Sequence, residues 1–334
     1  MKIIVPMAGM GKRMRPHTLT VPKPLIPIAG KPIVQRLVEE IAKVSNESIE
    51  EIAFIIGDFG KDVEKQLSDI AQNIGAECSI YYQEEALGTA HAIHCAAQSL
   101  SGHVVVAFAD TLFKADFVLD SEADSVIWVQ KVQDPSAFGV VKLDAENRIT
   151  DFVEKPKEFV SDLAIIGIYY FKDGENLRCE LQYLLDNEIL VKGEYQFTDA
   201  LENMKNKGLV FKSGQVIEWM DCGNKDATVH TNQRILEYHK DDELVCNSSI
   251  IENSVIIPPC YIGENVKIEN SIVGPHVSVG AGTVVNNTLV RNTIVQRNSN
   301  LEHLNLENSM IGNHVEIQGD VSELNVGDYA SFSK

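Results

Sequence analysis

The sequence predicts an α/β domain with a mostly parallel sheet over residues 1–240, followed by a parallel β-helix over residues 246–330. Two observations support this prediction. In the first part, short apolar runs alternate with amphipathic helical patterns, which is typical of helices that cover both faces of a parallel sheet. In the second part, apolar residues recur every six positions, a period that matches no helical face. A length of 334 residues suits two domains.

Five apolar, β-rich runs predict the strands of the first domain. They cover residues 2–6, 52–57, 78–82, 104–109 and 125–130. Helical patterns lie at 33–44, near 59–74 and at 88–100, the first with Ile33, Leu37, Val38, Ile41 and Val44 on one face. In such a sheet, ligands bind beyond the carboxyl ends of the strands.

A tetrapeptide motif predicts the coils of the second domain. Asn-Ser-Val-Ile at 253–256 recurs as Asn-Ser-Ile-Val at 270–273 and Asn-Thr-Leu-Val at 287–290, 17 residues apart each time. The six-residue beat predicts a row of core side chains: Ile250, Ile256, Ile262, Ile268, Val273, Val279 and Val285, with Val266, Ile272, Val277 and Leu289 in support. Residues 250–317 supply about four coils, enough for a continuous core. An irregular β-sandwich is the alternative.

Charge and composition exclude several partners. The 29 basic and 48 acidic residues leave a net charge of −19, which argues against nucleic acid or an anionic membrane as the main partner. No stretch approaches the roughly 18 apolar residues that a membrane span needs. The first residues lack a small-residue cleavage site, so no signal peptide is expected. The six cysteines form no closely spaced pair, and we expect reduced thiols in a cytoplasmic protein.

The strongest motif follows the first strand and runs from Ala8 to Thr18 as AGMGKRMRPHT, with Pro-Lys-Pro at 22–24. Gly9 and Gly11 let backbone N–H groups approach phosphate oxygens. Arg13 can contact two oxygens at once, and Lys23 adds a point charge. These residues predict a triphosphate site. The Walker A loop and the dinucleotide fingerprint both fail here, because Arg13 and Met14 stand where those motifs need other residues.

With these motifs the chain resembles the sugar-phosphate nucleotidyltransferases, or NDP-sugar pyrophosphorylases. It is most similar to the long-form glucose-1-phosphate thymidylyltransferases, and the resemblance covers essentially the whole chain. It implies a Rossmann-like nucleotidyltransferase domain and a left-handed β-helix of hexapeptide-like repeats. Lys12 departs from the family signature Gly-x-Gly-Thr-Arg, which has threonine at that position.

The resemblance implies roles for the nucleotide-binding residues. Arg13 and Lys23 would be catalytic, and Ala8, Gly9 and Gly11 would bind phosphates. In the segment QEEALGTA at 83–90, Gln83, Gly88 and Thr89 would contact the base, since an amide can pair with a pyrimidine edge. Asp110 ends an apolar strand, where a carboxylate suits Mg²⁺, and the family pattern pairs it with Asp221. By its position alone, a strand-end Asp can also cap a helix.

The sugar phosphate would bind farther along the chain. The resemblance assigns this role to Gly139, Glu154, Lys155, Tyr169 and Glu194. Residue by residue, other roles stay open: a hairpin with a Glu-Lys surface pair at 154–155, a core position for Tyr169, and a helix cap at Asp199. We expect His91 and His94 to lie on a packed or solvated helix face and Cys222 to be structural.

The predicted reaction joins a nucleoside triphosphate and a sugar 1-phosphate to give an NDP-sugar and pyrophosphate. dTTP and glucose 1-phosphate are the expected substrates. The alternatives are a uridylyltransferase, a mannose-1-phosphate guanylyltransferase, a non-catalytic regulatory subunit of this family, or an additional acyltransferase activity in the β-helix. We expect a homo-oligomer, assembled through the β-helix, although that domain could instead hold an allosteric site.

Overall fold

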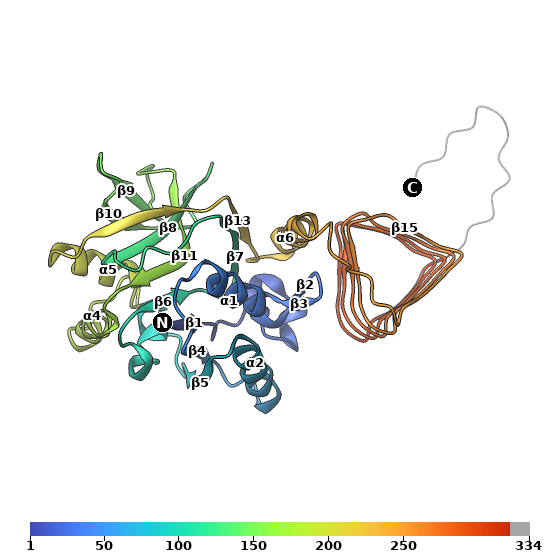
Figure 1. Cartoon of the computed structure of the whole chain (residues 1–334), viewed down its shortest axis with the longest axis horizontal. Coiled ribbons are helices and arrows are strands. Elements are labelled where there is room, and N and C mark those ends of the chain that lie inside the picture. The colour runs from blue at the N-terminus through green and yellow to red at the C-terminus, as the bar shows by residue number, and fades with distance from the viewer. Residues whose placement is uncertain (321–334) are drawn as a thin grey trace. The chain divides into compact units, whose positions relative to one another are not determined.

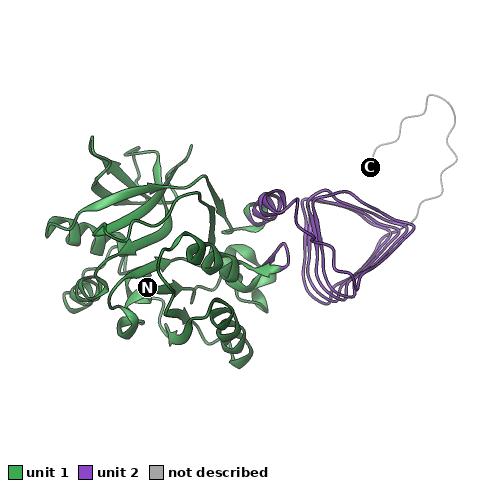
Figure 2. Ribbon diagram, viewed as in Figure 1, with its two compact units in different colours: residues 1–26, 31–227 green, residues 27–30, 228–334 purple. Residues whose placement is uncertain are grey.

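The computed structural model describes residues 1–320 and forms two compact units. The first unit comprises residues 1–26 and 31–227, and the second comprises residues 27–30 together with the chain from residue 228 (Figure 2). This division groups most of α6 (Lys225–Tyr238) and a short N-terminal segment with the β-helix. The boundary predicted at residue 240 was instead placed according to where the repeats begin, and it stays a prediction. Residues 321–330 of the predicted β-helix lie outside the described residues.

The first unit is built on a nine-stranded sheet in which β10-β9-β11-β6-β1-β4-β5 lie in order, with β8 beside β11 and β12 beside β8 (Figure 1). The strands are β1 (Lys2–Pro6), β4 (Glu51–Ile56), β5 (Glu77–Tyr82), β6 (Val104–Ala107), β8 (Ser125–Lys131), β9 (Gly139–Leu143), β10 (Ile149–Glu154), β11 (Leu163–Phe171) and β12 (Phe211–Gln215). The segment β6-β1-β4-β5 is parallel, whereas β11 runs antiparallel to β6 and β8. The predicted α/β class is confirmed.

The helices of this unit are α1 (Ile33–Val44), α2 (Lys61–Ile74), α3 (Thr89–His94), α4 (Gly174–Asp186) and α5 (Phe197–Asn206). Short 3₁₀ turns η1 (Lys12–Met14), η2 (His17–Leu19), η3 (Lys23–Leu25) and η4 (Ala97–Ser99) accompany them. Ile3, Ile4 and Val5 of β1 are all fully buried, so both faces of the central sheet are covered, as a parallel sheet requires. The pattern at 88–100 predicted one helix, but it forms α3 and η4.

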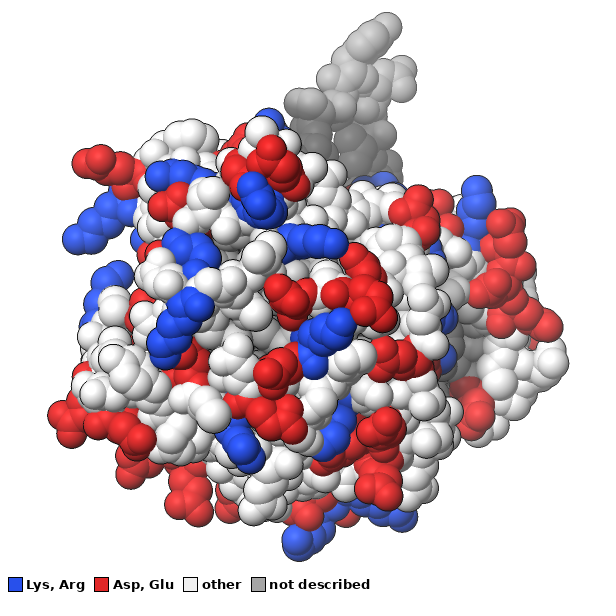
Figure 3. Space-filling view, turned by 60° about the vertical axis from the view of Figure 1, so that its left-hand side comes forward, with Lys and Arg blue, Asp and Glu red and all other residues white. Residues whose placement is uncertain are grey.

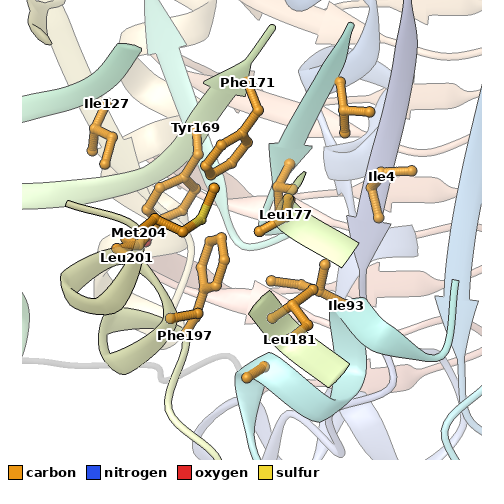
Figure 4. Packing of buried hydrophobic residues seen from close by; sticks show 14 of the residues in the cluster. Ile4, Ile93, Ile127, Tyr169, Phe171, Leu177, Leu181, Phe197, Leu201 and Met204 are labelled. Atoms are coloured by element: carbon orange, nitrogen blue, oxygen red, sulfur yellow. The ribbon is translucent and has the colours of Figure 1, made fainter. Parts of the chain in front are cut away.

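A second, two-stranded sheet lies near the carboxyl end of β6. It pairs β7 (Thr111–Lys114) with β13 (Glu218–Asp221) in antiparallel register, so Asp221 lies opposite Thr111. The main hydrophobic core packs α3, α4 and α5 against the sheet. Figure 4 shows Tyr169 and Phe171 among Leu177, Phe197 and Met204 in this core.

The second unit contains a left-handed parallel β-helix of three sheets, as predicted (Figure 1). One sheet stacks β14 (Ile250–Glu252), β17 (Lys267–Glu269), β20 (Val284–Asn286), β23 (Asn300–Glu302) and β26 (Glu316–Gln318). A second stacks β15 (Val255–Ile256), β18 (Ile272–Val273), β21 (Leu289–Arg291) and β24 (Asn305–Glu307). The third stacks β16 (Cys260–Ile262), β19 (Val277–Val279), β22 (Ile294–Val295) and β25 (Met310–Ile311). This unit also holds β2 (Pro27–Ile28), whereas β3 (Lys31–Pro32) belongs to the first unit.

Corner residues explain why this domain is rich in asparagine. Asn253, Asn270, Asn287 and His303 stack in one corner of successive coils, and all four have positive φ. Asparagine tolerates this left-handed conformation better than most residues. His276 and His314 also have positive φ and stack with asparagines in the other two corners. The three histidines thus turn the chain, as the asparagines do.

The six-residue beat predicted the core imperfectly. Ile262, Ile268, Val273, Val279 and Val285 are buried as predicted, but Ile250 is half exposed. One side of each coil is shorter than six residues, so Ile251 rather than Ile250 aligns with the buried Ile268 and Val285. Ile272 and Leu289 were also predicted as core residues, but they point outward. With Val255 they form an exposed apolar row, Val255–Ile272–Leu289, one residue per coil.

Acidic and basic side chains are interspersed on the face shown in Figure 3, without a broad basic surface. Across residues 1–320, every helix is too short or too polar to cross a bilayer.

Candidate active site

A pocket of about 310 Å³ opens beyond the carboxyl ends of β1, β5 and β6. It brings together eight of the predicted site residues: Ala8, Gly9, Lys23, Gln83, Gly88, Thr89, Asp110 and Glu194. Gly11, Arg13, Gly139, Glu154, Lys155, Tyr169 and Asp221 are not among the residues that line it. The first two lie on the adjoining loop, and the others lie on strands and loops whose positions are given below.

The loop after β1 is shaped by Gly11, which adopts a left-handed conformation with φ of 56°. The Thr18 hydroxyl donates to the Gly11 carbonyl at 2.8 Å and closes the loop. A Cβ on Gly11 would lie 3.0 Å from Thr18 Cγ2 and 3.1 Å from Lys23 Cβ, so glycine lets the loop pack against the base of Lys23. Beside Gly9, by contrast, a Cβ would meet no described atom within 4 Å, which leaves room for a ligand.

Four charged side chains gather next to this loop. Lys23 Nζ lies 2.6 Å from Asp110 Oδ2, with only 12% of the lysine side chain exposed. Asp221 reaches the same place through the β7–β13 pairing, because the Cys222 amide donates to the Asp110 carbonyl at 2.9 Å. Arg13 is close too, since a Cβ on Gly223 would lie 3.2 Å from Arg13 Nη2 and 3.0 Å from Asp221 Oδ1.

The electrostatics of Asp221 indicate a site that favours an additional cation. Burial raises the pKa of Asp221, and the charge of Asp110 raises it further, against smaller opposing effects of the Gly223 amide, Lys23 and Arg13. The repulsion between two carboxylates is relieved by a hard cation with oxygen ligands. Within residues 1–320, no group of three His, Cys, Asp or Glu side chains has metal-site geometry. The two carboxylates Asp110 and Asp221 have the chemistry that Mg²⁺ prefers, because this ion usually binds one or two carboxylates together with substrate phosphates and water.

The opposite end of the pocket is formed by the segment 83–90. Gln83 Nε2 donates to the Gly88 carbonyl at 3.2 Å and lies 3.1 Å from His91 Nδ1. Burial lowers the pKa of His91, and the neighbouring His94 lowers it further, so the ring is kept neutral. Sequence reasoning placed His91 on a packed or solvated helix face. The contact between His91 and Gln83 orients the Gln83 amide. The separation of these two residues by eight positions in the sequence did not suggest this role.

Gly88 holds this segment against the chain before α5. Its φ of 113° is a glycine conformation, and a Cβ would lie 2.4 Å from the Tyr195 carbonyl oxygen. The Tyr195 amide donates to Leu87 O at 2.8 Å, and the Phe197 amide donates to Thr89 Oγ1 at 3.0 Å. Thr89 therefore supports the segment through its side chain.

The predicted sugar residues cluster on β9, β10 and β11. Glu154 lies opposite Gly139, where a Cβ would come 3.0 Å from Glu154 Oε2. Lys155 is exposed, and its Nζ lies 3.4 Å from Glu154 Oε1. These residues are thus both a hairpin, as the alternative had it, and a group beside the site. Glu194 is exposed at the pocket and accepts from Gln196 Nε2 at 3.1 Å.

Tyr169 is a core residue, with 7% of its surface exposed. Its ring centroid lies 4.8 Å from that of Phe197 in an edge-to-face contact. Burial strongly raises the pKa of its phenol, and Glu154 adds to the shift, so the hydroxyl stays protonated. The core alternative for Tyr169 therefore matches its surroundings.

The family resemblance also places Thr198 and Asp199 in a further sugar-contact segment, with a helix cap as the alternative role of Asp199. Thr198 Oγ1 and Asp199 Oδ2 are buried, and neither has a hydrogen-bond partner among residues 1–320. Burial raises the pKa of Asp199, and the charge of Glu154 raises it further. The N-cap of α5 is Gln196, so Asp199 does not cap this helix as the alternative proposed.

A glycine-containing loop after the first strand, the Lys23–Asp110 salt bridge and a second carboxylate, Asp221, thus lie together beyond the carboxyl ends of the strands, where α/β proteins bind ligands. Comparison with known proteins identifies the class of this protein. The family model described as nucleotidyl transferase matches residues 2–238, and the chain belongs to this family. The fold and the relatives place it among nucleotidyltransferases of the NDP-sugar pyrophosphorylase kind.

Two relatives and one structure illustrate the similarity. A glucose-1-phosphate thymidylyltransferase from Streptomyces antibioticus is 30% identical over 302 residues, which cover 87% of this chain and 81% of the relative. The bifunctional protein GlmU from Methanococcus vannielii is 29% identical over 93% of this chain and 78% of its own length. A nucleoside-diphosphate-sugar pyrophosphorylase from Vibrio cholerae shares the fold, with a TM-score of 0.60, 20% identity, and coverage of 69% of this chain and 99% of that structure.

Proposed function

We propose that the protein is a glucose-1-phosphate thymidylyltransferase, which converts dTTP and glucose 1-phosphate into dTDP-glucose and pyrophosphate. The observation that carries the proposal is a pocket lined both by Gln83 and Gly88, which follow β5, and by Lys23 and Asp110, of which Asp110 follows β6. The strands β6 and β5 stand at the two ends of the parallel segment β6-β1-β4-β5. A nucleotide lying along the pocket would meet an amide at its base and charged groups at its phosphates. The similarity to a thymidylyltransferase over most of both chains favours this base and sugar.

The reaction brings together two anions, so its main requirement is charge stabilisation and alignment rather than a general base. The phosphate oxygen of the sugar 1-phosphate attacks the α-phosphorus in line, and pyrophosphate leaves. Arg13 would stabilise the charge on the α-phosphate and on the leaving pyrophosphate. Lys23 would contact the α-phosphate and the sugar phosphate. Its salt bridge to Asp110 fixes the position of its amine before the substrates bind.

The sugar phosphate would be held by residues beside the pocket. Lys155 would contact its phosphate, and Glu154 and Glu194 would accept hydrogen bonds from sugar hydroxyls. The Gly139 amide would face the sugar. The buried, protonated Tyr169 would support these sugar-binding residues by packing behind them.

We assign the Mg²⁺ site to Asp110 and Asp221. The raised pKa of Asp221 supports this assignment, because a bound cation offsets the repulsion between the two carboxylates. When bound, the ion would neutralise triphosphate oxygens.

UTP is the second candidate nucleotide. The Gln83 amide pairs equally well with uracil and thymine, which differ by one methyl group, worth about 1–3 kcal/mol in a hydrophobic contact. We therefore expect measurable activity with UTP as well as dTTP.

The test is pyrophosphate release with Mg²⁺, measured for dTTP, UTP, GTP, ATP and CTP against glucose, galactose, mannose and N-acetylglucosamine 1-phosphates. Asp110→Asn serves as the inactive control. The proposal predicts the highest kcat/KM for dTTP with glucose 1-phosphate, and loss of that activity in the control. A preference for GTP with mannose 1-phosphate would replace this proposal by a guanylyltransferase, and silence with every pair would favour a regulatory subunit.

We also propose that the chain forms a homo-oligomer through its β-helix. The row Val255–Ile272–Leu289 is apolar and exposed, although the chain carries a net charge of −19. The three residues of this row carry no charge. A second copy of the acidic chain can therefore approach this surface.

A further inference from the structure

The second unit includes residues 27–30, a short segment that lies far in sequence from the β-helix. Two of the places where the chain passes from one unit to the other follow predicted site residues. Lys23 stands four positions before Pro27, and Asp221 stands seven positions before Thr228. The segments that carry Lys23 and Asp221 are therefore continuous with the second unit.

The connection from Lys23 to the second unit is short and stiff. Pro22, Pro24 and Pro27 each restrict φ, so this stretch has few conformations available. The Ile26 amide donates to the Lys23 carbonyl at 3.1 Å, and the Ile26 side chain is fully buried. Residues 27–30 are thus joined to Lys23 by a short segment with few available conformations, so a displacement of these residues also moves Lys23.

Residues 29 and 30 form a tight turn that contacts the β-helix. Ala29 and Gly30 both have positive φ, of 45° and 83°. A Cβ on Gly30 would lie 2.2 Å from Tyr261 Cζ, so the tyrosine ring packs directly on this glycine. Tyr261 stands in β16, on the outer side of the third sheet of the β-helix, between the buried Cys260 and Ile262.

The side chain of Asn232, in α6, joins this turn to the β-helix. Its Oδ1 accepts from the Ala29 amide at 2.9 Å and from the Ser278 hydroxyl at 2.7 Å, and the residue is fully buried. Leaving either donor unpaired in this buried place costs about 1–3 kcal/mol. One oxygen atom thus links the turn, α6 and β19.

A second contact holds the far end of α6 on the same coil. His276, next to β19, pairs its Nε2 with Glu237 Oε1 at 2.5 Å. Helix α6 is therefore anchored at Asn232 and at Glu237, and its first residue follows Asp221 by four positions.

We propose that Asn232 is a positioning residue for nucleotidyl transfer, through which the β-helix holds the segments of Lys23 and Asp221 in their working geometry. The proposal rests on the proposed function, in which these two side chains act on phosphate. It makes the β-helix a support of the phosphate site, in addition to any role in assembly. Asn232 acts through the segments that carry Lys23 and Asp221 and touches no substrate.

The test compares Asn232→Ala with a matched control, Thr283→Val. Thr283 is also fully buried, and its hydroxyl donates to Gln296 O at 2.9 Å within the β-helix, away from the turn. Asn232→Ala is expected to lower kcat by about tenfold or more, since small misplacements of reacting groups have effects of this size. KM for the nucleotide should stay within about threefold, and Thr283→Val should keep kcat within about twofold.

Four further measurements separate positioning from loss of stability. Asn232→Asp keeps the accepting oxygen and should restore most of kcat. Ser278→Ala removes one of the two donors to Asn232 and should lower kcat less than Asn232→Ala does. Hydrogen exchange should accelerate in a peptide spanning residues 22–30 in Asn232→Ala but not in Thr283→Val. In a Lys23→Ala background, the effect of Asn232→Ala on kcat should be smaller than in the wild type, because the part that acts through the Lys23 amine is already lost.

The outcomes distinguish this inference from the proposed function. Equal kcat values for Asn232→Ala and Thr283→Val, or fully additive effects of Asn232→Ala and Lys23→Ala, would overturn the positioning role alone. An inactive wild-type protein, or an unaffected Lys23→Ala variant, would overturn the proposed function and this inference with it.

Discussion

Gly88 provides a quantitative test of how the segment 83–90, the proposed base-binding segment, is held. This residue is the N-cap of α3, with φ of 113° and ψ of 177°, and a Cβ there would lie 2.4 Å from Tyr195 O and 2.7 Å from Tyr195 N. Gly60 is a matched control, because it is the N-cap of α2 with φ of 83° and ψ of 166°. A Cβ on Gly60 would meet none of the described atoms within 4 Å.

The two alanine substitutions differ in what the new methyl group contacts. A non-glycine residue in this backbone conformation costs about 1–3 kcal/mol, which both variants share. In Gly88→Ala, a displaced Tyr195 also loses its hydrogen bonds to Leu87 O and Ala90 N, at about 1 kcal/mol each. We expect a loss of stability of about 3–5 kcal/mol for Gly88→Ala and about 1–3 kcal/mol for Gly60→Ala.

Urea unfolding and nucleotide kinetics would measure both effects. If the segment detaches instead of destabilising the whole fold, the difference of about 2 kcal/mol should appear as a roughly thirtyfold higher KM for the nucleotide in Gly88→Ala. Gly60→Ala should leave that KM unchanged. Equal unfolding free energies together with equal KM values in the two variants would refute this account of the segment.

Three further predictions concern charge and assembly. Arg13→Ala should lower kcat/KM by about 10²–10³, and near-normal turnover would remove Arg13 from the mechanism. Because burial and Asp110 raise the pKa of Asp221, its ionised form destabilises the fold above the ordinary carboxyl pKa. Asp221→Asn should therefore raise the melting temperature of metal-free protein at pH 7 while lowering activity, and the gain should fade as the pH falls toward about 4; a lower melting temperature at pH 7 contradicts this. Ile272→Glu should reduce the mass of the oligomer in light scattering, whereas Asn300→Glu on another sheet should not, and equal masses would argue against the Val255–Ile272–Leu289 row as the interface.

Local sequence signals predicted the elements of the first unit well. The runs at 2–6 and 52–57 became β1 and β4, and the pattern at 33–44 became α1, because periodicity in a single segment reports which face is buried. The run at 125–130 predicted β8, but its antiparallel pairing with β11 and the extension of the sheet by β9 and β10 were not predicted. Their pairing depends on contacts between distant segments, which periodicity does not encode.

The site shows the same division. The loop after β1 and the strand-end Asp110 were selected from motif and position, and the structure adds the 2.6 Å contact between Lys23 and Asp110. The pairing of Asp110 with Asp221 came from family resemblance. In the structure it depends on β7 and β13, which lie about a hundred residues apart in sequence. The contact of His91 with Gln83 was missed because nothing near His91 in sequence marks it.

The sequence by itself determined the fold class and the repeat architecture, because the apolar period and the asparagine corners are local properties of the chain. The reaction class came from the resemblance of its motifs to a known family. Tertiary structure alone decided which aliphatic residues of the β-helix face outward. A coil side of five residues instead of six moves the inward position by one residue, so Ile251 rather than Ile250 aligns with the buried Ile268. Tertiary structure also decided the buried contacts of Asn232. Its partners are Ala29, 203 positions away in the sequence, and Ser278, 46 positions away. Such contacts follow from packing, and packing is settled only when distant segments meet.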